Sequence, residues 1–154
     1  MRPTHDGVRI IPVDETADLL MAAARTLRRR FGDATARWGV TPSQARALRM
    51  VLAADEPMRL SALAERLRIV PRSATEVIDG LELHGLVVRQ PDPADRRAVC
   101  VVATEEGVRL GRLIEDARQQ AADELLQPLP EEDRKTLTRI LVTLLDGRTA
   151  ERSP

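Results

Sequence analysis

The sequence predicts a mostly helical protein that also contains one small pair of β-strands. Apolar residues recur at the three- and four-residue spacing of amphipathic helices through most of the 154 residues. The period changes to two in 86–89 and 99–102, which is typical of strands. A chain of this length favours a single domain, with lobes, over two independent ones.

The first two helices are marked by local start and stop signals. Asp14 is suited to the N-cap of the first helix, and Gly32 to its C-cap. Thr41 followed by Pro42 predicts the start of the second helix, because Thr is a good N-cap and Pro fits the first turn. We expect that helix to end near 55–57.

The next segment has the order of a helix–turn–helix. A short strand is expected at 58–60, and Ser61 is the expected N-cap of the third helix. Pro71 predicts the start of a fourth helix, which should end at His84 and Gly85.

Two strands then flank a polar loop. Residues 90–98 are too many for a tight hairpin turn and too charged to be buried between the strands 86–89 and 99–102. Strands joined by such a loop, directly after a helix–turn–helix, predict a wing. A helix follows from the N-cap Thr104 to about Pro128, and a last helix is expected at 131–146.

Composition excludes several classes of protein. The chain is 43% hydrophobic and 31% charged, with 24 basic and 24 acidic residues, which is typical of a soluble globular protein and gives no global nucleic-acid signal. Arginine supplies 23 of the basic residues; it suits phosphate contacts, but a genome rich in G and C gives the same bias. Without an apolar run of 18 residues or a signal peptide, we expect a cytoplasmic protein with no membrane segment.

Nothing in the sequence predicts an enzyme. The two histidines are His5 and His84, and neither is near the single cysteine, Cys100. A nucleophile needs an adjacent base and a group that orients it, and we find no such set. We therefore expect no catalytic residues, no metal site and no cofactor.

Four segments carry a resemblance to a known family. They are 63–67 (LAERL), 71–87 with its ending LELHGLV, 95–98 (DRRA) and 104–107 (TEEG). In this order the chain resembles the MarR family of bacterial winged helix–turn–helix transcriptional regulators, over about 14–146. The implied fold is mostly α with a small β-wing, a winged helix–turn–helix plus terminal dimerisation helices.

The helix after Pro71 is the expected recognition helix. In a helix–turn–helix the second helix enters the major groove with its N-terminal residues near the bases. The expected DNA-binding residues there are Arg72, Ser73, Ala74, Thr75 and Glu76.

These residues differ in what they offer to DNA. Arg72 suits a guanine or a phosphate, and Ala74 offers only apolar contact with a thymine methyl group. Ser73 and Thr75 are equally well explained as ordinary polar residues of a first helical turn. Glu76 departs from the family, where a basic residue often follows the Thr; it either reads cytosine N4 or pairs with Arg72.

The resemblance also assigns the wing. It implies that an arginine at the tip, Arg96 or Arg97, enters the minor groove and that Asp95 braces the loop. The alternative is that Asp95 and Arg97 merely pair on a surface loop.

The resemblance divides the chain into regions. It implies a helical dimerisation region at 14–37 and 104–147, a DNA-binding region at 38–103, and flexible termini at 1–13 and 148–154. The expected dimerisation residues are Leu19, Leu20, Leu137, Ile140, Leu141, Leu144 and Leu145. The alternative is a monomer that packs these residues internally.

Members of the family bind small molecules between the two regions. Phe31, Trp38 and Met58 are candidates to line such a crevice, although core packing explains them as well. Oxidant-sensing members carry their cysteine near the first helix, so Cys100 is expected to be a buried, inert thiol.

The resemblance thus implies a homodimeric regulator, a repressor, that binds double-stranded DNA with a pseudo-palindromic site and responds to a small-molecule effector. The alternative is a winged-helix protein-interaction module that has lost DNA binding.

Overall fold

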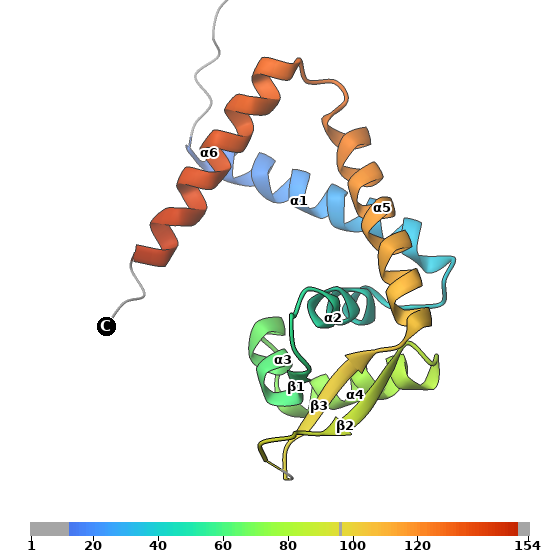
Figure 1. The fold of residues 1–154 in the computed structure, drawn as a ribbon. Coiled ribbons are helices and arrows are strands. Elements are labelled where there is room, and N and C mark those ends of the chain that lie inside the picture. Colours follow the sequence, from blue (N-terminus) through green and yellow to red (C-terminus); the bar gives the residue numbers. More distant parts are fainter. Residues whose placement is uncertain (1–12, 96, 151–154) are drawn as a thin grey trace, which may run out of the picture.

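The computed structural model describes residues 13–95 and 97–150 (Figure 1). These residues form two lobes joined by α5. The elements are α1 (Val13–Ala36), α2 (Pro42–Leu52), β1 (Met58–Arg59), α3 (Leu60–Leu67), α4 (Pro71–Leu83), β2 (Val87–Pro91), β3 (Val99–Ala103), α5 (Glu105–Leu126) and α6 (Glu131–Ala150). The prediction of a mostly helical winged helix–turn–helix is confirmed.

Local signals set the start of two helices as expected. Thr41 and Gln44 form a complete capping box at α2, in which the Thr41 hydroxyl accepts from the Gln44 N–H and the Gln44 side chain accepts from the Thr41 N–H. Thr104 caps α5 by accepting from the N–H of Gly107 at 3.0 Å. Each cap satisfies N–H groups that the first turn leaves without a helical partner.

Two helix boundaries differ from the prediction. Helix α1 continues through Gly32 to Ala36, where buried Thr35 donates to the carbonyls of Phe31 and Gly32. Helix α3 begins at Leu60, directly after β1, so Ser61 lies inside the helix and does not cap it.

Two further helix ends also differ from the prediction. Helix α2 ends at Leu52, short of the predicted 55–57. Helix α6 extends to Ala150 and α1 begins at Val13, so residues 148–150 and 13 of the predicted termini are helical. The rest of the predicted flexible termini, 1–12 and 151–154, lies outside the described residues.

The three strands form one antiparallel sheet in the order β1-β3-β2. Val87 pairs with Ala103 and Pro91 with Val99, so the loop of the predicted wing leaves from the far end of this ladder. Met58 pairs with Val101, which makes the short strand predicted at 58–60 the third member of the sheet.

One apolar core holds together the lobe made of α2, α3, α4 and the sheet, and it includes the N-terminal half of α5. Its largest fully buried side chains come from several elements of the chain: Leu48, Leu63, Ile78, Leu81, Val87, Val101 and Ile114. Because Ile78 and Leu81 point inward, the opposite face of α4 is left on the surface.

Helix α6 stands apart from this core. It makes no more than isolated contacts with the other described elements, and in Figure 1 it follows α5 in the lobe that does not hold the wing. Ile140, Leu144 and Leu145 are exposed on it. A helix of this kind gains little stability from its own hydrogen bonds, so its apolar residues need a partner surface.

Candidate DNA-binding surface

The surface face of α4 carries polar and charged side chains. Arg72, Thr75, Glu76 and Asp79 are exposed, while Ser73 is half-buried. The Nε of Arg72 donates to Oε1 of Glu76 at 3.2 Å, and the Thr75 hydroxyl donates to the carbonyl of Pro71 at 3.1 Å. The structure thus brings Arg72 and Glu76 together, as one of the two sequence-based interpretations of Glu76 expected.

Ala74 is a correction to the predicted interface. Its side chain is fully buried, on the same inward face of α4 as Ile78 and Leu81. The methyl group is therefore not available to a thymine. The reason is helical periodicity, since residues 74, 78 and 81 fall on one face of an α-helix.

Arg89 of β2 binds two of the three acidic side chains of α4. Its guanidinium donates to Asp79 Oδ1 at 2.6 Å and also pairs with Glu82, whose Oε1 accepts from the Arg89 backbone N–H at 3.1 Å. Sequence reasoning missed this contact. The only signal was a basic residue at the end of the otherwise apolar strand predicted at 86–89.

The wing loop is closed by Asp95. Its carboxylate accepts from the Arg97 N–H at 3.0 Å, and its carbonyl accepts from the Ala98 N–H at 2.9 Å. These bonds form a tight turn that leaves Arg97 exposed. Arg96, the other candidate for the tip, lies outside the described residues.

A second carboxylate, Asp92, anchors the base of the wing. It is only 7% exposed and accepts from Arg59 Nε at 2.5 Å and from the N–H groups of Ala94 and Asp95 at 2.7 and 3.1 Å. The hydrogen bond from Arg59, followed by that from the Ala94 N–H, lowers the pKa of Asp92 to about 2. The wing is therefore tied to β1, which leads into α3.

Cys100 lies against this anchor. Its thiol is buried and donates to Asp92 Oδ2 at 3.6 Å. Burial, and then the neighbouring Asp92 carboxylate, raises the pKa of the thiol above its ordinary value. The structure thus places Cys100 where an unreactive thiol was expected.

The residues predicted to line a ligand crevice are core residues. Met58 is buried in the core, and Phe31 and Trp38 pack against it. None of the three lines the cavity between α2 and α5. Core packing, the alternative considered from the sequence, describes their surroundings.

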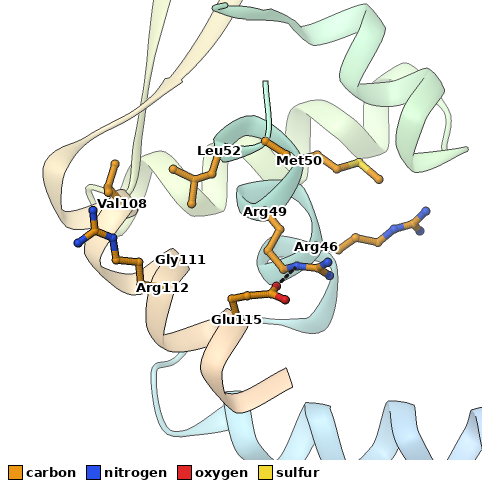
Figure 2. A pocket seen from close by; sticks show the side chains of 9 residues that line it. Arg46, Arg49, Met50, Leu52, Val108, Gly111, Arg112 and Glu115 are labelled. Atoms are coloured by element: carbon orange, nitrogen blue, oxygen red, sulfur yellow. Dashed lines mark hydrogen bonds and ion pairs between the residues drawn. The ribbon is translucent and has the colours of Figure 1, made fainter. Parts of the chain in front are cut away.

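That cavity has a volume of about 700 Å³ (Figure 2). Its apolar lining includes Met50, Leu52 and Val108, and its polar lining consists of Arg46, Arg49, Arg112 and Glu115. Sequence reasoning did not find it. Gly111, which also lines the cavity, was the available signal, since a glycine within a helical pattern often marks a close approach.

Only some of the charged side chains around the cavity form ion pairs. Arg49 Nε donates to Glu115 Oε2 at 3.0 Å, and Arg118 also binds this carboxylate. The bond from Arg118 is the main reason that the pKa of Glu115 is lowered. Arg46 and Arg112 extend on opposite sides in Figure 2, and neither pairs with a carboxylate among the described residues.

The part of the chain that the structure describes, 13–95 and 97–150, offers neither a metal site nor a membrane span. No group of three or more His, Cys, Asp or Glu side chains there is arranged to hold a metal ion. No helix in the same residues is both long enough and apolar enough to cross a membrane.

Comparison with known proteins agrees with this geometry. The model of the MarR family matches residues 40–99. An uncharacterized HTH-type transcriptional regulator of Mycobacterium leprae is 35% identical over 131 residues, which cover 84% of this chain and 90% of that protein. The chain belongs to the MarR family. A second uncharacterized HTH-type regulator, from Mycobacterium bovis, is 38% identical over 122 residues, covering 79% of this chain and 83% of the relative.

Solved structures show the same fold. The apo form of wild-type MarR from Escherichia coli matches with a TM-score of 0.77 and 24% identity, over 88% of this chain and 98% of that one. Family and fold together make this protein a MarR-family DNA-binding regulator of transcription.

Proposed function

We propose that this MarR-family protein is a homodimeric repressor that binds a pseudo-palindromic duplex, with α4 in the major groove and the wing in the minor groove. One observation carries the proposal. The α4 surface and the β2–β3 wing lie in the lobe farthest from α6, and α6 presents apolar residues that no other described element covers (Figure 1).

The α4 surface supports contact with the major groove. The groove of B-DNA is wide enough for one helix, whose N-terminal residues lie nearest the bases. Arg72 and Thr75 are exposed there, and the buried face of α4 fixes the rotation of the helix. Ser73 is half-buried, and its short hydroxyl suits a contact with a phosphate.

The wing supports contact with the minor groove. Asp95 holds the turn and Asp92 ties its base to Arg59, so the exposed Arg97 is carried on a braced loop. A narrow, A·T-rich minor groove concentrates negative potential and attracts such an arginine.

The terminal helices support a homodimer. Leu19 and Leu20 of α1, and Ile140, Leu144 and Leu145 of α6, are exposed, each at more than 40%, while Leu137 and Leu141 are half-buried. Burial of this surface against a second copy would remove it from water at about 25 cal/mol per Å². A two-fold dimer also places two recognition helices at a separation that fits inverted half-sites.

Sedimentation tests the dimer directly. We expect a species of about 34 kDa, twice the 17.1 kDa of one chain, at micromolar concentration. Leu144→Glu should shift the population towards the monomer, because it places a charge in the apolar surface. A wild-type protein that sediments as a monomer would remove the dimer from the proposal.

The cavity between α2 and α5 is the proposed effector site. Its apolar lining and the guanidinium groups of Arg46 and Arg112, which pair with no carboxylate of the described chain, suit an organic anion with an apolar body, such as a phenolic acid. Occupation of the cavity lowers DNA affinity if the ligand prefers a different arrangement of α2 and α5. Salicylate should raise the melting temperature of the wild-type protein, and Arg112→Ala should reduce this rise.

Salt dependence of duplex binding decides between the regulator and the interaction module. A protein that contacts several phosphates loses affinity steeply with salt, with a slope of about −0.9 per contact. An interaction module shows no duplex binding at low salt. Selection of bound duplexes from a random pool then measures the spacing of the inverted repeat.

A further inference from the structure

Arg72 and Glu76 form a pair on the face of α4 that the proposed function directs at DNA. Their side chains are 90% and 64% exposed, so the pair contributes little to the stability of the helix. The contact from Arg72 Nε to Glu76 Oε1, at 3.2 Å, brings the two charged groups side by side on this face.

The pair keeps free the groups that read bases. Because Nε of Arg72 is the bonded nitrogen, both terminal NH₂ groups remain for the O6 and N7 acceptors of a guanine. The second oxygen of Glu76 remains to accept from the N4 amino group of a cytosine. At 1.5 Å rise per residue the two residues are about 6 Å apart along the helix. Neighbouring base pairs are roughly 3.4 Å apart, and two long side chains that converge can bridge this difference.

The other acidic residue on this face, Asp79, is already paired with an arginine. Asp79 Oδ1 accepts from Arg89 at 2.6 Å, and the same guanidinium binds Glu82. Asp79 lies about one turn after Glu76 and carries the same charge, but its carboxylate is held towards β2.

We propose that Arg72 and Glu76 act as one unit that selects a guanine next to a cytosine within each half-site. Arg72 donates to guanine O6 and N7, and Glu76 accepts from cytosine N4 of the adjacent base pair. This specificity rests on the proposed entry of α4 into the major groove. In this arrangement Glu76 contributes to base selection, although repulsion between its carboxylate and the phosphates by itself would weaken binding.

The test compares two variants that remove the same charge. Duplexes bound by the full-length wild-type protein, by Glu76→Gln and by Asp79→Asn are selected from one random pool. Glutamine reads adenine N6 and N7, so Glu76→Gln should change the preferred cytosine to adenine and keep the guanine. Asp79→Asn should keep both bases. Arg72→Ala should lose the guanine preference.

Competition between matched duplexes gives the size of the effect. For the wild type, replacing the selected cytosine should weaken binding roughly 5- to 150-fold. The ratio of the affinities for the two duplexes should fall to about one in Glu76→Gln and stay unchanged in Asp79→Asn. Equal melting temperatures would show that the exposed substitutions leave the fold intact. An unchanged cytosine preference in Glu76→Gln, or an equal loss in Asp79→Asn, would overturn the specificity unit while leaving duplex binding in place. Absence of salt-sensitive duplex binding by the wild type would instead overturn the proposed function, and the specificity with it.

Discussion

Gly107 is the position where a single methyl group should do the most damage. A Cβ there would overlap the carbonyl oxygen of Leu86 and lie 3.0 Å from the carbonyl carbon, both of which are backbone atoms that have no rotamer to change. The N-terminus of α5 would have to move away from the turn after α4. That movement breaks the bonds by which Thr104 holds this turn, namely its hydroxyl to the Gly85 carbonyl at 2.6 Å and its N–H to the Leu86 carbonyl at 3.1 Å.

The cost of Gly107→Ala follows from these contacts. Two hydrogen bonds at about 0.5–1.5 kcal/mol each are lost, and the better helix propensity of alanine returns about 0.5–1 kcal/mol. We therefore expect a net loss of up to about 2.5 kcal/mol in the free energy of unfolding. Urea denaturation at one fixed protein concentration measures it, because the stability of the proposed dimer would depend on concentration.

Gly32→Ala is the matched control. Gly32 also lies within a helix, but its Cβ would meet only Pro42 Cγ, at 4.0 Å. The same substitution should therefore stabilise the protein by about 0.5–1 kcal/mol. A Gly107→Ala variant that is stabilised as much as Gly32→Ala would refute the close contact between α5 and the backbone of the α4–β2 turn.

Three further predictions concern the wing and its base. Arg97→Ala should weaken duplex binding by about 1–3 kcal/mol without changing the melting temperature, and unchanged affinity in a titration would remove the wing from the interface. The folded-state pKa of Asp92 is about 2, below the ordinary value of about 3.9, so the ionised carboxylate stabilises the fold above about pH 4 and this stabilisation is lost as the pH falls through about 2. The difference in urea midpoint between the wild type and Asp92→Asn should therefore shrink over that range. A difference that stays constant would contradict the ion pair with Arg59. Cys100 should react slowly with iodoacetamide in buffer and rapidly in urea, whereas equally fast alkylation in buffer would show that the thiol is accessible.

Local chemistry determined much of the fold. Thr41 and Thr104 start their helices because a hydroxyl can accept from an N–H only three residues away. Pro71 starts α4 because its missing N–H costs nothing in a first turn. Such signals depend only on neighbours in the chain, so the sequence alone is enough to identify them.

The candidate site was predicted less completely. Arg72, Thr75 and Glu76 lie on the exposed face of α4 as expected, but Ala74 is buried because the rotation of the helix is set by the core. The three residues proposed for a ligand site fill or border the core, and the cavity instead forms where Gly111 lets α5 approach Leu52.

The sequence by itself determined the order of the helices, the wing and the pair of residues at 72 and 76, because each depends on spacing along a few residues. Only the tertiary structure decided which charges meet. Arg59 reaches Asp92 across 33 positions, and Arg89 reaches Asp79 from a different element. Ion pairs of this kind depend on how strands and helices cross, and that geometry is set by the packing of the whole core.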